Sequence, residues 1–180
     1  MSGPDMTMRT ASAQHLPVLH KLVESAYRGD SAKRGWTHEA DLLGGQRTDL
    51  ESLQDIMADP NQVILLAIDG TTIAGCVQLV RVKQGLAYLG LLTVDPDRQT
   101  GGLGKKLLSA SELYVSENWQ AQAIEMTVIR QRADLIAYYE RRGYALTGER
   151  RPFPLDDPRY GLPKTSELEF VVLRKEIDAA

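Results

Sequence analysis

The spacing of hydrophobic positions changes along the chain, and each spacing predicts a different kind of element. Over residues 13–28 the apolar side chains recur every three or four positions, which is typical of an amphipathic helix. Residues 62–94 instead carry apolar runs with an Asp-Gly turn signal at positions 69–70, which indicates a β-hairpin followed by a third strand. After residue 100 helical and strand patterns alternate. The chain is therefore expected to combine an antiparallel part with a later alternating part.

The expected elements follow one another in an order that defines a fold class. Strands are predicted at residues 7–11, 62–68, 72–82, 87–94, 123–128, 144–150 and 167–174. Helices are predicted at residues 13–28, 50–57, 102–119 and 132–142, with short helical pieces within 29–49. Suitable N-cap residues are Ser12 and either Thr48 or Asp49, and Gly143 stands at a C′ position. This order predicts an α/β fold (α+β mixed sheet): a central, mostly antiparallel mixed sheet flanked by helices, with right-handed strand–helix–strand crossovers.

Composition narrows the class of protein. The length suits one domain, expected to span residues 1–180 with residues 1–6 as a disordered N-terminal extension. The formal net charge of −3 argues against a nucleic-acid partner. No apolar run reaches the length of a membrane span, and the first residues lack a secretory signal. The single cysteine, Cys76, fits a reducing compartment, so a cytoplasmic location is expected. The three histidines show no metal-ligand spacing, and no metal is expected.

Residues 98–108, RQTGGLGKKLL, place three glycines directly before a predicted helix. A helix start presents unpaired N–H groups and a partial positive charge, so the stretch predicts an anion site, unless it is only a glycine-rich turn. A Walker loop is excluded, because Gln99 stands at its first glycine position and Lys106 at its Ser/Thr position. A dinucleotide fingerprint is excluded, because Leu107 occupies its third glycine position.

The spacing that remains is Q-x-x-G-x-G, formed by Gln99, Gly102 and Gly104. It resembles the acyl-CoA pyrophosphate loop of the GNAT superfamily of N-acetyltransferases. The segment LGLLTVDPDRQTGGLGKKLL is similar to that family's central strand, loop and helix, and DLIAYYERRGY is similar to its later helix. The likeness covers residues 7–174. It implies the GNAT (acyl-CoA N-acyltransferase) fold and direct acetyl transfer from acetyl-CoA to an amine within a ternary complex, with Cys76 offering no covalent relay.

The resemblance also implies which residues hold acetyl-CoA. They are Leu92, Thr93, Val94, Gln99, Thr100, Gly101, Gly102, Leu103, Gly104, Lys105, Arg132 and Tyr139. The strand residues would act through main-chain atoms, and a strand N–H would polarise the thioester carbonyl. Lys105 is the side chain favoured for phosphate contact. Arg132 stands where the family often has an asparagine, so its contact with phosphate or amide oxygens is a departure from the family pattern.

Tyr139 is the candidate general acid. It lies four residues before Gly143, where many members of the family place a tyrosine that protonates the departing thiolate, and a phenol has a suitable pKa for this step. Packing is the alternative role for this tyrosine. Some members carry a basic glutamate where this chain has Tyr88, a poor base. The tentative base is Glu125; Glu39, a water chain, or an amine that arrives already neutral are the alternatives.

The acceptor is a primary amine that the sequence does not identify. Trp36, Tyr88 and Phe153 are the candidate pocket residues, although Trp36 and Phe153 are equally consistent with covering the edge of the core. Residues 13–60 carry eight acidic and five basic side chains, a mild hint toward a small cationic amine. Acetylation of a protein or peptide amine, and a non-catalytic acyl-CoA-binding module, are the alternatives. Homodimers are common in the family, so a homodimer is included among the expected partners.

Overall fold

The computed structural model describes residues 6–27, 43–44, 48–98, 101–153, 162–163 and 168–177. Seven strands form one twisted sheet in the order β1-β3-β4-β5-β6-β9-β7. They are β1 (Met6–Thr10), β3 (Gln62–Asp69), β4 (Thr72–Lys83), β5 (Leu86–Val94), β6 (Ala123–Ile129), β7 (Ala145–Pro152) and β9 (Glu169–Glu176). The short strands β2 (Leu43–Gly44) and β8 (Leu162–Pro163) pair with each other in a separate two-stranded sheet. All neighbours in the large sheet are antiparallel except β5 and β6, so the expected mixed, mostly antiparallel sheet is confirmed.

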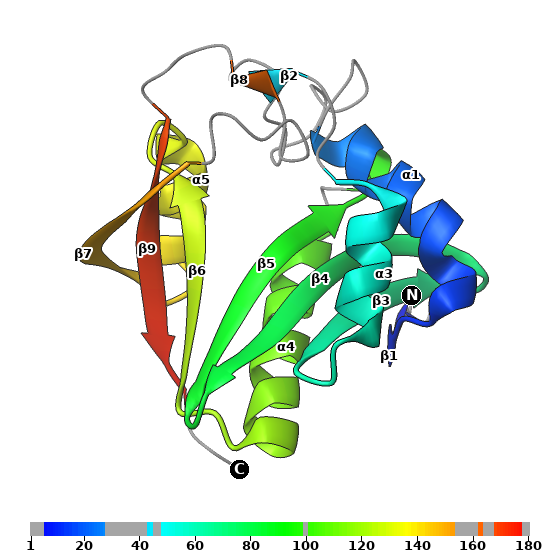
Figure 1. Ribbon diagram of the computed structural model, residues 1–180, viewed down its shortest axis with the longest axis horizontal. Helices are drawn as coiled ribbons and strands as arrows, with labels where there is room; N and C mark the ends of the chain where they lie inside the picture. The colour runs from blue at the N-terminus through cyan, green and yellow to red at the C-terminus, as the bar shows by residue number, and fades with distance from the viewer. Residues whose placement is uncertain are drawn as a thin grey trace.

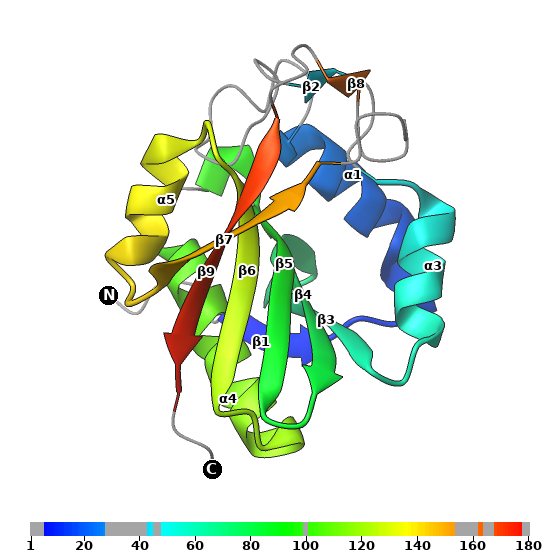
Figure 2. The same cartoon turned by 60° about the vertical axis from the view of Figure 1, so that its left-hand side comes forward.

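In the described part of the chain, four α-helices flank the large sheet on its two faces (Figures 1 and 2). They are α1 (Leu16–Tyr27), α3 (Leu50–Ala58), α4 (Leu103–Trp119) and α5 (Ala133–Glu140), with single 3₁₀ turns at Ala13–His15 and Pro96–Arg98. Helices α1 and α3 cover one face of β3, β4 and β5, and α4 packs on the opposite face of the same strands. The sheet therefore lies as a middle layer between helices.

The expected longer helices and the strands are present, and their ends differ from the predicted ones by at most two residues, except that α1 begins at Leu16 because residues 13–15 form a 3₁₀ turn. Asp49 caps α3 as expected, since its carboxylate accepts a hydrogen bond from the Ser52 N–H at 2.7 Å. Gly143 follows α5 with φ of +95°, the left-handed conformation of a C′ glycine. Strand β1 begins at Met6, the last residue of the expected extension, and residues 1–5 lie outside the described part of the chain. The helical pieces expected within 29–49 also fall mainly on residues outside it.

The order of the last strands carries one feature that the pattern of hydrophobic positions did not specify. Strand β9 lies between β6 and β7 and pairs antiparallel with both. The connection from β6 through α5 therefore skips one position in the sheet and leaves β7 at the edge. Edge placement agrees with β7 being exposed along most of its length.

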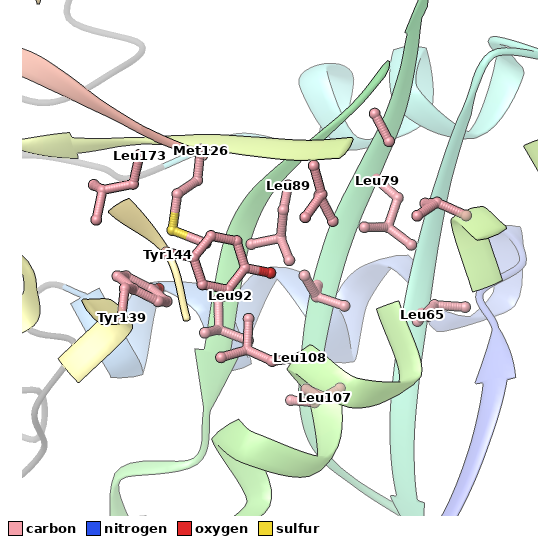
Figure 3. Packing of buried hydrophobic residues seen from close by; sticks show 14 of the residues in the cluster. Leu65, Leu79, Leu89, Leu92, Leu107, Leu108, Met126, Tyr139, Tyr144 and Leu173 are labelled. Atoms are coloured by element: carbon pink, nitrogen blue, oxygen red, sulfur yellow. The ribbon is translucent and has the colours of Figure 1, made fainter. Parts of the chain in front are cut away.

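The core has two main parts, one on each face of the sheet. The larger part gathers side chains from β4, β5, β6, β9, α4 and α5, and Figure 3 shows its leucines around the ring of Tyr144. The smaller part lies under α1 and α3 and includes Leu19, Leu66, Cys76 and Leu91. Tyr139 belongs to the larger part, which places α5 on the same face of the sheet as α4.

Candidate active site

The site begins where two neighbouring parallel strands stop pairing. Strands β5 and β6 are in register only over Leu86–Tyr88 and Ala123–Glu125. Beyond these residues the two strands diverge, as Figure 1 shows. A cavity of about 310 Å³ occupies the space between them. Its lining residues are Tyr27, Gln78, Tyr88, Leu89, Gly90, Leu91, Leu92, Met126, Thr127, Val128, Ile129, Arg132, Leu135, Tyr139, Phe153 and Phe170.

The cavity wall formed by β5 contains a bulge. Pairing with β4 shifts between the partners Cys76–Thr93 and Gln78–Gly90, so two residues of β5 lie opposite one residue of β4. Leu91 in this bulge has φ of +53°, a left-handed conformation that is costly for a branched apolar residue. Such a conformation persists only where surrounding contacts hold it, so we expect neighbouring groups to bind the backbone of this segment.

Side-chain hydroxyl and thiol groups hold the carbonyls of the bulge. The hydroxyl of Tyr27, the last residue of α1, donates to the Leu92 carbonyl oxygen. The Thr93 hydroxyl donates to the Leu91 carbonyl oxygen at 2.9 Å, and the Cys76 thiol reaches the same oxygen at 3.8 Å. The side chains of Leu92, Thr93 and Val94 are all buried. Contact of these three residues with a ligand would therefore involve main-chain atoms, and of the three Leu92 lines the cavity.

Tyr139 lies in the cavity wall on α5 and is 5% exposed. Burial, the largest cause, raises the pKa of its phenol well above the usual value. The phenols of Tyr27, Tyr138 and Tyr144 raise this pKa further, and the Arg132 guanidinium opposes the rise. Tyr139 therefore stays protonated at neutral pH and presents a hydroxyl that can donate a hydrogen bond or a proton to a group in the cavity.

The neighbouring tyrosines differ from Tyr139 in their surroundings. Tyr138 is partly buried, and the guanidinium of Arg142 stacks on its ring at 3.9 Å from the centroid. Tyr144 packs edge-on against Tyr139, with ring centroids 6.1 Å apart. Its hydroxyl is buried and has no hydrogen-bond partner among the described residues. Neither Tyr138 nor Tyr144 lines the cavity, so Tyr139 is the member of the three that a ligand there would meet.

Arg132 contributes positive charge to the cavity. It precedes α5 at the N-cap position, and only 8% of the residue is exposed. Its Nε atom lies 3.9 Å from Oδ1 of the exposed Asp134 carboxylate. Among the described lining residues it is the only one with a charged side chain. A buried guanidinium in this wall suits an oxygen-rich ligand, which agrees with the binding role predicted for Arg132.

Tyr88 and Phe153, two of the three predicted acceptor-pocket residues, both line the cavity. The Tyr88 hydroxyl and the Thr127 hydroxyl lie 2.6 Å apart, so β5 and β6 remain bridged by side chains just beyond their last paired residues. Phe153 packs against Phe170 with ring centroids 5.2 Å apart. Trp36, the third predicted residue, lies outside the residues that the structure describes, as does Glu39.

Glu125 is partly buried beside the cavity without being one of its lining residues. Its carboxylate accepts a hydrogen bond from the Arg151 guanidinium at 3.1 Å, and 12% of its side chain is exposed. It pairs with Tyr88 across the β5–β6 ladder. A proton from an amine in the cavity would therefore reach Glu125 through an intervening group or water, rather than by direct contact.

The start of α4 provides an anion-binding surface. Gly102 is the N-cap with φ of +73°, and no side chain caps the helix. The first intrahelical bond runs from the Lys106 N–H to the Gly102 carbonyl at 3.2 Å, so the N–H groups of Leu103, Gly104 and Lys105 lie outside the helix's own hydrogen bonds. No heavy atom of the described residues lies within 4 Å of the position that a Cβ on Gly102 would take. This open helix start fits the diphosphate of a coenzyme A derivative.

The remaining predicted residues of the glycine stretch are placed as follows. Gly101 and Lys105 are exposed at the start of α4, with the lysine in the first turn. Arg98 donates to the Asp69 carboxylate at 2.6 Å, so its charge is already paired. Gln99 and Thr100 lie outside the described residues.

Two further properties of the described residues concern metals and membranes. They contain no group of three or more histidine, cysteine, aspartate or glutamate side chains that could hold a metal ion. No helix in this part of the chain is long and apolar enough to cross a membrane.

Sequence reasoning missed one side chain at the centre of the site, Tyr27. It follows the buried positions of α1 and precedes a polar segment, so its spacing marks it only as a helix-end aromatic. Its role is set by a contact with Leu92, 65 residues later in the chain. Gln78, Thr127 and Phe170 were missed for the same reason, since each reaches the cavity only through strand pairing.

Comparison with known proteins agrees with this geometry. A family model described as the acetyltransferase (GNAT) family matches residues 22–144, which is more than half of the chain. The chain therefore belongs to the GNAT acetyltransferase family, and the resemblance noted from its two motifs is confirmed. No curated protein matches the sequence.

Solved structures of the same fold cover nearly the whole chain at low sequence identity. The ribosomal-protein-S18-alanine N-acetyltransferase of Escherichia coli has a TM-score of 0.71 at 16% identity, over 97% of this chain and 96% of its own. yncA of Salmonella typhimurium, assigned as an acetyltransferase and solved with its cofactor acetyl-CoA, has a TM-score of 0.70 at 15% sequence identity. The match covers 98% of this chain and 96% of that one. A spermidine N-acetyltransferase chimera of Vibrio cholerae SpeG and hSSAT has a TM-score of 0.68 at 15% sequence identity, and the match covers 95% of each chain. At these identities the likeness shows the fold alone.

Proposed function

We propose that this chain is an N-acetyltransferase that moves an acetyl group from acetyl-CoA to a primary amine by direct transfer in a ternary complex. One observation carries the proposal: the cavity between the separated ends of β5 and β6 places a buried, protonated Tyr139 opposite strand backbone. The same strand β5 leads directly into the open helix start at Gly102. A donor with both a diphosphate and a thioester has a complementary surface for each part.

The start of α4 would hold the donor's diphosphate. The N–H groups of Leu103, Gly104 and Lys105 supply hydrogen bonds and the positive end of the helix dipole. Gln99, Thr100 and Gly101 are proposed to complete this contact, and the Lys105 side chain adds a positive charge. Acetyl-CoA supplies the acetyl group as an activated thioester. The backbone of Leu92, Thr93 and Val94 would hold its arm along the unpaired edge of β5.

Tyr139 would protonate the thiolate as it leaves. A thiol has a pKa near 8.5, and burial keeps the phenol of Tyr139 protonated well above that pH. The hydroxyl is therefore available at any working pH. Arg132, in the same wall, lowers the cost of the charge that develops there because its guanidinium opposes the rise in the Tyr139 pKa.

Glu125 is proposed as the final acceptor of the amine proton, reached through a relay. Tyr88 and Thr127, whose hydroxyls lie 2.6 Å apart, are on the cavity side of β5 and β6 next to it. A hydroxyl pair can pass a proton without holding a charge. Arg151 keeps the carboxylate oriented through its hydrogen bond at 3.1 Å.

The acceptor is proposed to be a small molecule with a primary amine, bounded by Tyr88, Phe153 and, by expectation, Trp36. The fold relatives are described as acting on a ribosomal-protein alanine and on spermidine, so this architecture serves both protein and small-molecule amines. The homodimer, the cytoplasmic location and the extent of the domain over residues 1–180 stay predictions.

The test is a thiol-release assay with acetyl-CoA and a broad panel of amines, run beside calorimetric binding of acetyl-CoA. We expect binding, and CoA release that depends on one class of amine. Gly102→Glu should weaken acetyl-CoA binding at least about tenfold, because it puts a negative charge beside the diphosphate. Gly148→Glu is the matched control: that glycine, in β7, also has a left-handed φ of +86° and open space at its Cβ position.

Two results would contradict parts of the proposal. Equal acetyl-CoA affinity in both glycine variants would overturn the assignment of the helix start. Tight acetyl-CoA binding with no thiol release from any amine would favour a non-catalytic acyl-CoA-binding module.

A further inference from the structure

Tyr27 lies on α1, on the face of the sheet opposite the helix that carries Tyr139. Tyr27 is 8% exposed, and its hydroxyl donates a hydrogen bond to the Leu92 carbonyl at the cavity wall. Burial, and after it the phenol of Tyr27, raises the pKa of Tyr139. Tyr27 thus links helix α1 to the backbone of the bulged segment by a hydrogen bond.

The hydrogen bond from Tyr27 to the Leu92 carbonyl also restricts the backbone next to that oxygen. In a strand, the N–H and the C=O of one residue point to the same edge. The Leu92 carbonyl accepts a hydrogen bond from the Tyr27 side chain, and β6 no longer pairs with β5 at this level. Leu92 lines the cavity, and by this rule its N–H points to the same open edge as its carbonyl. That N–H belongs to the Leu91–Leu92 peptide unit, whose carbonyl is held by Thr93 and Cys76, and Tyr27 holds the next unit, Leu92–Thr93.

We propose that Tyr27 is a positioning residue: by holding the carbonyl of the Leu92–Thr93 peptide unit it fixes the backbone of Leu92 from one side, so that the Leu92 N–H faces the thioester carbonyl of the donor. The proposal rests on the proposed acetyl transfer. By occupying the Leu92 oxygen, the Tyr27 hydroxyl also screens a partial negative charge that would otherwise lie beside the oxygen of the thioester. A preorganised N–H donor of this kind stabilises negative charge as it develops on the carbonyl oxygen.

The test uses Tyr27→Phe, which keeps the ring and removes the hydroxyl. Acetyl-CoA labelled with ¹³C at the acetyl carbonyl is bound to the wild-type protein, and its carbonyl stretch is recorded by isotope-edited infrared spectroscopy. We expect a shift to lower frequency in the wild type and a return toward the solution frequency in Tyr27→Phe. In the amine assay, kcat should fall roughly tenfold, with the KM for acetyl-CoA within about twofold of wild type.

Two further variants separate positioning from general damage. Tyr144→Phe removes a buried hydroxyl that bonds no described residue, so the infrared band and kcat should stay at wild-type values. Thr93→Val removes the hydroxyl from the Leu91 carbonyl, and it should move the band in the same direction as Tyr27→Phe. This second variant tests the same bulge if Tyr27→Phe does not fold.

The outcomes distinguish this proposal from the function on which it rests. If the wild-type protein does not bind acetyl-CoA, the proposed function and the role of Tyr27 are both overturned. If the wild type shifts the carbonyl band and Tyr27→Phe shifts it equally, the proposed function stands and the positioning role is overturned. A kcat loss in Tyr27→Phe with an unchanged band would also overturn it.

Discussion

Strands β5 and β6 behave differently along their length. Over Leu86–Tyr88 and Ala123–Glu125 they form an ordinary parallel ladder. In this paired half Ala87 and Ile124 face each other and are fully buried. In the separated half, Leu89–Leu92 and Met126–Ile129 border a cavity of about 310 Å³ instead of each other.

The comparison shows how a sheet can combine a core with a reaction site. Parallel strands are usually buried on both faces, and opening them exposes backbone groups that need new partners. In the separated half, the Leu92 carbonyl accepts a hydrogen bond from Tyr27 of α1, and the Leu91 carbonyl accepts one from Thr93 of β5 itself. Substitutions in the paired half should therefore change stability, and substitutions in the separated half should change kinetics.

The largest effect is expected from Tyr139→Phe in the separated half. Removing the proton donor for the leaving thiolate should lower kcat by about 10²- to 10³-fold, which corresponds to about 3–4 kcal/mol of barrier. The KM for acetyl-CoA should change little, since the ring remains in place. Steady-state kinetics with the best amine of the panel measures both constants.

Tyr144→Phe is the control for this variant, because it removes a hydroxyl from the adjoining ring, which does not line the cavity. Its kcat should match wild type. A wild-type kcat in Tyr139→Phe would mean that Tyr139 serves packing. It would also contradict the expectation that substitutions in the separated half change kinetics.

The next effect concerns stability, and it uses the same substitution in both halves. Ile124→Ala should lower the free energy of unfolding by about 3 kcal/mol, because the side chain is fully buried between two paired strands. Ile129→Ala should lower the free energy of unfolding less, because Ile129 already borders the cavity. The same variant should raise the KM for acetyl-CoA or for the amine. Urea unfolding and steady-state kinetics compare the two variants. Equal destabilisation with no kinetic change in Ile129→Ala would break the distinction between the halves.

The fold could be predicted from the sequence because its elements are locally consistent. Asp49 before an apolar helix, Gly143 after one, and the Asp-Gly turn each specify an element boundary without long-range information. The insertion of β9 between β6 and β7 could not be predicted in this way. It depends on which edge of β6 is left open, and that is decided by packing between segments that are far apart in the chain.

The site divides along the same line. The glycine spacing located the helix start at Gly102, and the tyrosine spacing located Tyr139 in what proved to be the cavity wall. Tyr27 and the bulge at Leu91 carry no local signal, because one depends on a tertiary hydrogen bond and the other on a leucine in a conformation that sequence disfavours. Motifs identify residues whose chemistry is direct, whereas residues that act by holding backbone in place appear only in the structure.

The smallest effect is expected at the boundary of the two halves, where Glu125 is the last residue of β6 that pairs with β5. Glu125→Gln should lower kcat about tenfold if the carboxylate receives the amine proton through a relay, since an amide cannot accept it. Arg151→Gln breaks the same ion pair and leaves the carboxylate in place. Both variants should lose a similar stability of about 1 kcal/mol, so thermal unfolding is measured beside kcat. Arg151→Gln should then keep most of its kcat, and equal losses of kcat in the two variants would show that the pair acts by structure alone.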